Sequence, residues 1–273
     1  MAFRNLIHST RQGIPCSRFG RSQPRLPCAS GYANSRRPLI PGKFAHMDAI
    51  DTEVRKAPLF IALDDESARA LTASMDEVRL TRGKVLFSEG DQGDRLYVIV
   101  EGKMKLGTVS NDGRENLLSI LGPGDMFGEL SLFDLGPRAS TATAVTDARL
   151  LALKNEDLQQ LLRTRPEVAF HLLKSLAQRL RRTASIVEDL VFSDVPGRVA
   201  KALLQLAHRF GNLNEEGIHV NHDLTQEELA QLVGASRETV NKALADFAGR
   251  NWLRLEARAV TILDEERLAK RAK

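Results

Sequence analysis

Cysteine is almost absent from this 273-residue chain, and its scarcity excludes several classes of protein. Only Cys16 and Cys28 occur, and both precede the first segment with a folded pattern. Two thiols do not build a disulfide scaffold, and they do not supply the four thiolates that an iron–sulfur sensor needs. The scarcity is typical of a reducing compartment, so we expect a cytoplasmic protein.

Long apolar runs and a catalytic cluster are missing as well. No run approaches the roughly 20 apolar residues that span a bilayer, so we expect no membrane segment. His171, His208, His219 and His222 are scattered, and no nucleophile–base pair or metal-ligand cluster accompanies them. The spacing of His219 and His222 is more typical of a loop pair than of a zinc site, and no pair of axial haem ligands stands out. We therefore predict that the protein is not an enzyme and holds no metal.

Acidic residues are absent from residues 1–46, which carry seven Arg and one Lys. Since the whole chain has a formal charge of +4, the rest of the chain is acidic, at −4. The basic balance of the chain is therefore no argument for nucleic-acid binding. We predict that residues 1–46 are a disordered basic leader, and the alternative is a targeting or interaction arm.

Residues 47–155 are expected to form an N-terminal β-roll domain. A helical pattern covers 48–75, and short apolar or β-branched runs then alternate with glycine-bearing turns. Short strands at such even spacing favour a β-barrel or jelly roll over a parallel α/β sheet. The expected strands are 85–87, 96–100, 103–109, 117–121, 141–145 and 150–153.

Residues 128–140, with the sequence GELSLFDLGPRAS, place Glu129 and Arg138 at the two ends of a short apolar turn. A cyclic nucleotide presents the two complementary groups, because its ribose hydroxyl donates to a carboxylate and its phosphodiester accepts two hydrogen bonds from a guanidinium. Backbone N–H groups near the two charged residues complete a phosphate cradle. The predicted ligand contacts in this cassette are Gly128, Glu129, Leu130, Arg138, Ala139 and Ser140.

Residues 156–193 are expected to form a long helix. Apolar side chains recur along it at alternating spacings of four and three, which is typical of a coiled-coil seam. The predicted seam is Ala169, Leu173, Leu176, Leu180, Thr183, Val187 and Leu190. A seam of this length exposes apolar surface unless it has a partner, so we predict a parallel homodimer. The alternative is that the seam packs on its own β-roll.

Residues 194–273 are expected to form a winged helix-turn-helix module. The sequence DVPG at 194–197 breaks the long helix, and a helix over 199–210 follows. Thr225 to Glu228 predict a capping box that opens a helix over 227–233, which Gly234 ends. Ser236 then caps a second helix over 237–250, and the segments 252–255 and 259–263 predict a hairpin.

The first turn of the helix that begins after Ser236 is polar and charged. Arg237, Glu238, Asn241 and Lys242 share one face near the end that enters the major groove in helix-turn-helix proteins. Arg and Lys recognise guanine and Glu accepts from cytosine, so these residues favour double-stranded DNA as the partner. The alternative is an ordinary solvated helix face. The predicted phosphate contacts and caps are Thr225, Gln226, Ser236 and Thr239.

Taken together, these features resemble the CRP/FNR family of dimeric transcription regulators, and most closely the actinobacterial cAMP receptor proteins of the Crp/GlxR type. The resemblance covers residues 48–271 and leaves out the leader. Its most specific motifs are FGELSLF at 127–133 with Pro137 and Arg138, and LVGASRETV at 232–240. Residues 179–183 and 194–200 also look like the family. The implied fold class is α+β, with a cyclic-nucleotide-binding β-roll, a long dimerisation helix and a winged helix-turn-helix.

The resemblance implies roles for individual residues. Glu129 falls where the family binds the ribose hydroxyl of cAMP, and Arg138 falls where it binds the phosphate. Arg179 and Thr183 fall where the long helix reaches the base. The residues expected to read DNA bases are Arg237, Glu238 and Lys242. The implied protein is a homodimer that binds a palindromic site, activates or represses promoters, contacts RNA polymerase and is nucleoid-associated.

Two positions depart from the family pattern. Ala139 stands where Ser or Thr is common, and Ala184 stands where a polar residue usually reaches the ligand of the partner chain. Each lost neutral hydrogen bond costs about 0.5–1.5 kcal/mol. These departures leave open an alternative, in which the same fold binds DNA constitutively or responds to a different small molecule. A regulatory domain of a kinase or channel is disfavoured, because no kinase motif or membrane span accompanies the cassette.

Overall fold

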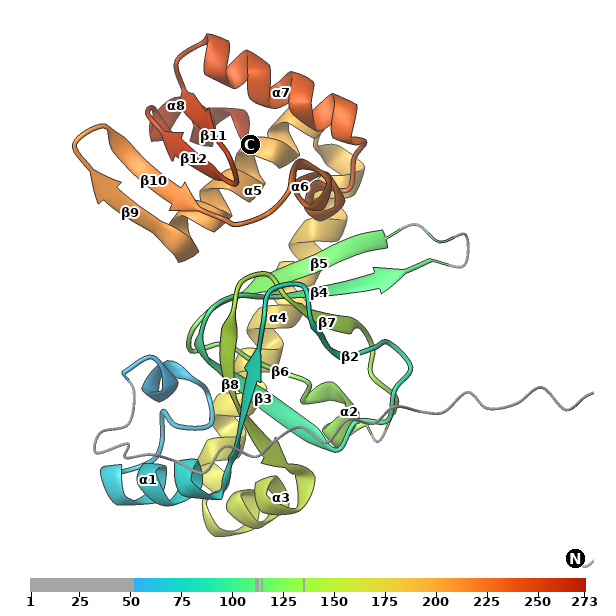
Figure 1. Ribbon diagram of the computed structural model, residues 1–273, viewed down its shortest axis with the longest axis vertical. Helices are drawn as coiled ribbons and strands as arrows, with labels where there is room; N and C mark the ends of the chain where they lie inside the picture. Colours follow the sequence, from blue (N-terminus) through green and yellow to red (C-terminus); the bar gives the residue numbers. More distant parts are fainter. Residues whose placement is uncertain (1–51, 111–112, 114, 135) are drawn as a thin grey trace, which may run out of the picture. The chain divides into compact units, whose positions relative to one another are not determined.

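The computed structural model of the protein describes residues 52–110, 113, 115–134 and 136–273 (Figure 1). The predicted leader, residues 1–46, lies outside the described residues, and its character stays a prediction. None of the helices within the described part is both long and apolar enough to pass through a bilayer.

Two four-stranded antiparallel sheets form the N-terminal β-roll that the sequence predicted, with the strand orders β1-β8-β3-β6 and β2-β7-β4-β5. The prediction missed two strands, because β1 (Asp76–Leu80) is rich in charge and β6 (Met126–Phe127) has only two residues. The other strands are β2 (Val85–Phe87), β3 (Arg95–Glu101), β4 (Met104–Val109), β5 (Glu115–Leu121), β7 (Thr141–Ala144) and β8 (Ala148–Lys154).

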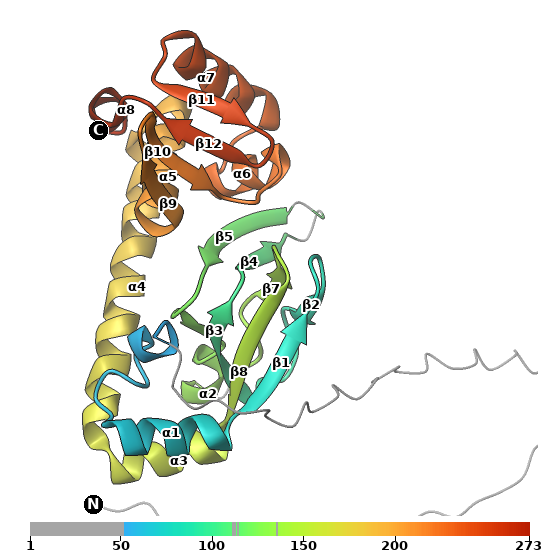
Figure 2. The same cartoon turned by 60° about the vertical axis from the view of Figure 1, so that its left-hand side comes forward.

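Apolar side chains from both sheets form a shared core. Leu150 of β8 pairs with Ile99 of β3 and Val78 of β1, and Met104 of β4 pairs with Ala144 of β7. All five residues are buried in one cluster with Phe127. Because neighbouring side chains on a strand point to opposite faces, the alternate residues of β3 and β8 form a second core. That second core packs against the 3-10 turn at Val54–Lys56 and three helices (Figure 2), which are α1 (Asp65–Ser74), α3 (Asn155–Thr164) and α4 (Pro166–Phe192).

The long helical segment divides into two helices, α3 (Asn155–Thr164) and α4 (Pro166–Phe192). The expectation of one helix over 156–193 was wrong at Arg165, which has φ −135° and ψ 71°. A proline disfavours the α conformation of the residue before it, and it is well tolerated in the first turn of a helix. Pro166 therefore ends α3 and opens α4, which leaves 27 residues in α4.

The C-terminal module contains α5 (Val195–Phe210), α6 (Gln226–Val233), α7 (Arg237–Gly249) and α8 (Glu265–Arg271) around a sheet of order β11-β12-β10-β9. Helix α5 begins four residues earlier than expected, because the Asp194 carboxylate accepts a hydrogen bond from the Gly197 N–H and caps it. The hairpin of β9 (Gly211–Asn214) and β10 (Gly217–Asn221) was missed, since its sequence is rich in Gly and Asn. The predicted wing is β11 (Leu253–Glu256) with β12 (Ala259–Ile262).

Candidate functional site: a buried ligand cassette and a winged helix-turn-helix

The cassette begins at a tight turn between β6 and the short helix α2 (Leu130–Phe133). Gly128 has φ +82°, a conformation that side chains disfavour. A Cβ atom on Gly128 would lie 2.8 Å from Nη1 of Arg138, so a side chain there would displace the guanidinium. The turn therefore requires glycine, and it brings Glu129 and Arg138 into one cassette.

Arg138 is held firmly although it is almost completely buried, at 3% exposure. Its Nη1 donates to the carbonyl oxygen of Gly128 at 2.8 Å and to Oγ of Ser131 at 3.1 Å. Its Nη2 donates to the carbonyl oxygen of Arg95 at 2.8 Å, and the guanidinium lies 4.2 Å from the ring centre of Phe87. These three hydrogen bonds and one cation–π contact fix the plane of the guanidinium.

One edge of the Arg138 guanidinium remains open. Its Nε atom is buried and has no hydrogen-bond partner among the described residues. Among the described residues Nη2 makes a single hydrogen bond, and it has two N–H groups, so Nε and Nη2 together retain two donors. Burial lowers the pKa of Arg138, and an anion placed against that edge would compensate the cost of burying the cation. A phosphate fits this requirement.

Glu129 presents the complementary acceptor. The residue is fully buried, at 0% exposure, and its Oε1 accepts from Nη1 of Arg179 at 2.5 Å. Its Oε2 has no partner among the described residues. Burial raises the pKa of Glu129, and the Arg179 cation opposes this shift. A hydroxyl donor at Oε2 would satisfy the buried oxygen and stabilise the carboxylate.

The remaining cassette residues occupy different environments. Leu130 is the first residue of α2, so its N–H has no partner within that helix. Ala139 is exposed and Ser140 is half-buried, directly before β7. Sequence reasoning missed Ser131, although a small polar residue within the apolar run Leu-Ser-Leu-Phe was a visible signal. Its hydroxyl is the only side-chain group among the described residues that hydrogen-bonds to Arg138.

Helix α4 brings one of its two predicted ligand residues to the cassette. Arg179 contacts Glu129 and also donates to the carbonyl oxygen of Met126 at 2.7 Å. Thr183 is exposed one turn further along, and its hydroxyl donates to the carbonyl oxygen of Arg179 at 3.1 Å. The structure therefore joins Arg179 to the cassette and leaves Thr183 on the outer surface beside Ala184, which is also exposed.

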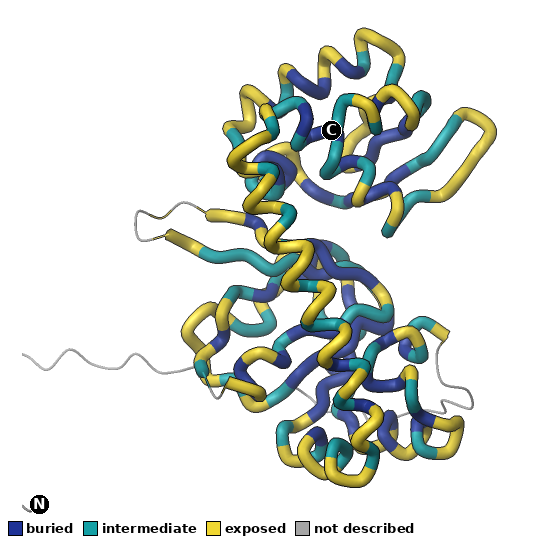
Figure 3. The backbone as a smooth tube through the Cα atoms, turned by 180° about the vertical axis from the view of Figure 1, so that it is seen from behind, coloured by how far each residue is buried: buried dark blue, intermediate teal, exposed yellow. Residues whose placement is uncertain are grey.

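The predicted seam of α4 lies on the surface of the chain (Figure 3). Leu173 is 64% exposed and Leu180 is 71% exposed, whereas Val168 and Leu172 are buried against the β-roll. The alternative in which the seam packs on its own β-roll is therefore wrong, because a different face of α4 makes that contact. An apolar stripe of this extent marks an interaction surface.

The helix-turn-helix has the local signals that the sequence predicted. The Thr225 hydroxyl accepts from the N–H of Glu228, whose carboxylate accepts from the N–H of Thr225, so the capping box is confirmed. Gly234 has φ +69° and ends α6. The Ser236 hydroxyl accepts from the N–H of Thr239 at 3.2 Å and caps α7. The residues that pack the two helices together are Val233, Val240, Leu244 and Phe247, all of them buried.

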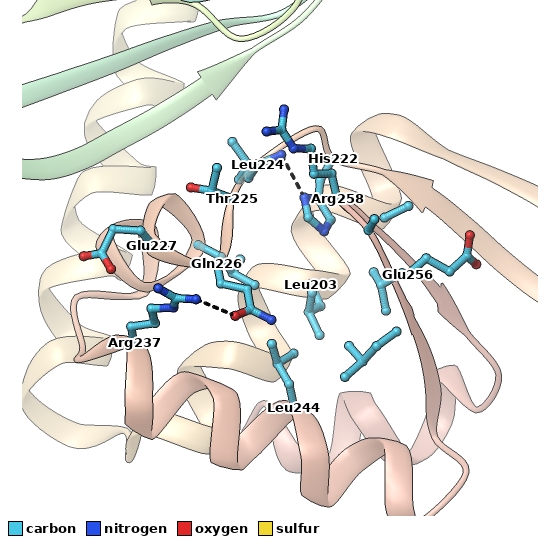
Figure 4. Close-up of a pocket in the computed structure, with 15 residues that line it drawn as sticks. Leu203, His222, Leu224, Thr225, Gln226, Glu227, Arg237, Leu244, Glu256 and Arg258 are labelled. Atoms are coloured by element: carbon cyan, nitrogen blue, oxygen red, sulfur yellow. Dashed lines mark hydrogen bonds between the residues drawn. The ribbon is translucent and has the colours of Figure 1, made fainter.

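The predicted DNA-contacting side chains are exposed on α6 and α7. Glu238 and Lys242 form an ion pair of 2.8 Å on the surface of α7. Nη2 of Arg237 donates to Oε1 of Gln226 at 3.4 Å, so the N-terminal ends of both helices meet (Figure 4). The buried Oδ1 of Asn241 has no hydrogen-bond partner among the described residues.

A cavity of about 340 Å³ lies between this pair of helix ends and the wing (Figure 4). Gln226 and Arg237 line one side of it, and Arg258 of the wing turn lines another. His222 borders it and is buried, which lowers its pKa to about 4. Its Nδ1 accepts from the N–H of Leu224 at 3.1 Å, so His222 is a neutral structural group at pH 7.

In the described part of the chain, no group of three His, Cys, Asp or Glu residues is arranged to hold a metal ion.

A buried anion-binding cassette in a β-roll, together with a winged helix-turn-helix, defines a DNA-binding regulator controlled by a small ligand. Residues 77–165 match the cyclic nucleotide-binding domain, and residues 197–271 match the Crp-like helix-turn-helix domain. The chain belongs to the CRP-like family of transcription regulators, as its resemblance predicted.

Three relatives illustrate the match. The CRP-like cAMP-activated global transcriptional regulator of Mycobacterium tuberculosis is 54% identical over 224 residues, which are 82% of this chain and 100% of the relative. The cyclic AMP receptor protein of Thermus thermophilus is 37% identical over 217 residues, covering 78% of this chain and 97% of the relative. The structure of a c-di-GMP-responsive global regulator of Xanthomonas campestris has a TM-score of 0.64 and 26% identity, covering 73% and 99% of the two chains.

Proposed function

We propose that the protein is a homodimeric transcription regulator whose binding to palindromic double-stranded DNA is controlled by cAMP. The observation that carries the proposal is the pair of buried atoms without partners, Oε2 of Glu129 and Nε of Arg138. One is an acceptor and the other a donor, and a cyclic nucleotide offers a ribose hydroxyl and a phosphodiester to match them. Leaving such atoms unpaired costs about 1–3 kcal/mol each, or more when the group is charged.

The control of DNA binding would pass through α4. Arg179 contacts Glu129, and Thr183 lies on the seam through which two copies of α4 would pair. A nucleotide in the cassette therefore lies close to the dimer helix. Pairing of the seams would place two recognition helices α7 about 34 Å apart, which is one turn of DNA and the spacing of a palindromic site. Such a coupling between two sites is reciprocal, so DNA would also tighten nucleotide binding.

The relatives support the choice of nucleotide and the other partners. The Mycobacterium tuberculosis relative is named a cAMP-activated global regulator, and the Thermus thermophilus relative is named a cyclic AMP receptor. As transcription regulators act on promoters, we include RNA polymerase as a partner and a cytoplasmic, nucleoid-associated location. A regulator of this kind needs no enzymatic activity of its own.

The experiment that tests the proposal is a calorimetric titration of the full-length chain with cAMP, followed by operator binding with and without cAMP. We expect one cAMP per chain and a change in operator affinity of about 5- to 150-fold, the range of a typical allosteric coupling. The absence of heat together with an unchanged operator affinity would refute control by cAMP.

A second candidate function is the same regulator with another effector, or with none. Ala139 and Ala184 motivate it, because Ala139 lacks the hydroxyl and Ala184 lacks the polar group that the family pattern has at these positions. The Xanthomonas campestris relative is described as responsive to c-di-GMP, which illustrates a different effector on a similar fold. Operator affinity measured separately with cAMP, cGMP, c-di-GMP and no nucleotide separates the candidates. Equal affinities in all four samples would favour constitutive binding.

Lys242 is expected to set a base preference and not the overall DNA affinity. Its ion pair with Glu238 is exposed and so stabilises little, which leaves the ammonium available for a base edge. We expect Lys242→Ala to lose about 1–3 kcal/mol of discrimination at one base position, measured over all single-base variants of a selected site. Lys270→Ala is the matched control, because Lys270 forms the same kind of pair with Glu266 on α8. Equal weakening on every sequence would instead make Lys242 a phosphate contact.

A further inference from the structure

The short segment of residues 125–129 contacts two different helices at its two ends. At one end Glu129 accepts a hydrogen bond from Arg179 of α4. At the other end Oδ2 of Asp125 accepts from Nη2 of Arg209, in the last turn of α5. Because α5 opens the winged helix-turn-helix module, this segment touches the ligand cassette, the dimer helix and the DNA-binding module within one chain.

The Asp125 end of the segment is rigidly built. Oδ2 of Asp125 also accepts from the N–H of Gly122 at 2.7 Å. The backbone N–H of Asp125 donates to the carbonyl oxygen of Gly122 at 3.0 Å. Its own carbonyl oxygen accepts from the N–H of Ile99 in β3 at 3.0 Å. Arg209 contacts the same region twice, since its Nη1 donates to the carbonyl oxygen of Ile120. A guanidinium held at two points transmits both position and orientation.

Arg179 connects the two ends. It donates to the carbonyl oxygen of Met126, the residue next to Asp125, while its other nitrogen contacts Glu129. Burial lowers the pKa of Arg209, Asp125 opposes the shift, and the nearby cations Arg182 and Arg179 add to it. Arg179 and Arg209 are therefore close enough to repel each other across one short stretch of chain. Any movement of Arg179 changes the electrostatic environment of Arg209.

We propose that residues 125–129 are a coupling segment that connects the nucleotide site to the DNA-binding module within a single protomer, with Asp125 and Arg209 as its contact to that module. The inference rests on the proposed function, in which a nucleotide at the cassette controls DNA binding. A ribose hydroxyl that donates to Oε2 of Glu129 withdraws negative charge from the carboxylate whose Oε1 accepts from Arg179, and so weakens the Arg179 contact. The resulting shift of Arg179 relative to Met126 acts on the Asp125–Arg209 pair, in addition to any signal through the α4 seam.

A second ion pair between the β-roll and the DNA-binding module supplies a matched control. Nζ of Lys105 in β4 lies 2.6 Å from Oε1 of Glu228 in α6. The side chains of Lys105 and Glu228 are 23% and 19% exposed, and those of Arg209 and Asp125 are 25% and 32% exposed. Among the described residues, the Lys105 side chain has no hydrogen bond to the cassette or to α4. The two pairs are thus similar in chemistry and burial and differ in their connection to the nucleotide site.

The test uses the full-length chain and its Asp125→Asn, Arg209→Gln, doubly substituted and Lys105→Gln variants. Asn at 125 keeps one acceptor oxygen for the Gly122 N–H, removes the charge and replaces the other oxygen by an NH2 donor. Fluorescence anisotropy with a palindromic duplex selected by the wild-type chain gives the ratio of DNA affinities with and without saturating cAMP. We expect Asp125→Asn and Arg209→Gln to change this ratio by about 2- to 30-fold while cAMP still binds. The doubly substituted chain should show the same ratio as each single variant, because either substitution alone already removes the contact between Asp125 and Arg209.

The outcomes separate the inference from the function on which it rests. A wild-type ratio of one would overturn the proposed function and the coupling segment with it. A wild-type ratio above one that neither Asp125→Asn nor Arg209→Gln alters would overturn the coupling segment alone. An equal change in Lys105→Gln would also overturn it, since any contact between the β-roll and the module would then suffice. If one of the two single variants does not fold, the other still decides.

Discussion

Replacing Arg138 by Ala is expected to weaken cAMP binding by at least about 100-fold while DNA binding without nucleotide survives. Two charge-assisted hydrogen bonds from the open edge of Arg138 would be lost, at about 1.5–3 kcal/mol each. A loss of 2.8 kcal/mol already corresponds to about 100-fold in affinity. The substitution also leaves the carbonyl oxygens of Gly128 and Arg95 without their donor, so some thermal stability is lost with it.

The measurement is a calorimetric titration of the variant with cAMP, with thermal unfolding followed in parallel. Arg138→Lys retains the charge without the forked donor edge and should lie between the wild type and Arg138→Ala. Arg95→Ala is the control, because it keeps the backbone carbonyl that Arg138 uses and removes the ion pairs of the Arg95 side chain with Asp76 and Asp94. A variant Arg138→Ala that binds cAMP as tightly as the wild type would place the phosphate elsewhere.

The cassette was largely predictable because its two charged residues lie close together in sequence. Glu129 and Arg138 belong to one turn, and the requirement for Gly128 is local as well. The supporting contacts were not predictable, since they join positions far apart in the chain. The Arg138 bond to Arg95 spans 43 residues, and the Arg209 bond to Asp125 spans 84. Only the folded sheets bring such atoms together.

The same distinction explains the fold. The helix-turn-helix was predicted nearly to the residue, because the capping box at Thr225, the left-handed Gly234 and the Ser236 cap are all local signals. The charged strand β1 was missed, since its pairing with β8 depends on a partner more than 60 residues away, as in Val78 with Leu150. The break at Arg165 had a local signal in Pro166. The helical periodicity on both sides outweighed it in the prediction.

The surface stripe on α4 leads to the second large expected effect. A Leu180→Glu substitution should raise the dissociation constant of the dimer by at least about 100-fold. Burying a leucine side chain contributes about 1.5–3 kcal/mol, and a two-fold symmetric interface loses it twice. The substitution also places two like charges opposite each other in an apolar seam. Leu180 is 71% exposed in the single chain, so the monomer should fold normally.

Sedimentation equilibrium measures whether the Leu180→Glu chain has the mass of a monomer or of a dimer. DNA binding then reports the consequence of losing the dimer. A monomer has one recognition helix, so the variant should bind full and half sites of a palindrome with similar, weak affinity. Ile61→Glu is the matched control, because Ile61 is an exposed apolar residue outside α4 and the same charge there should leave the dimer intact. A Leu180→Glu chain that remains dimeric would mean that another surface pairs the chains. Thr183 would then not lie at the dimer interface, and the link from the cassette to α4 would rest on the contact of Arg179 with Glu129.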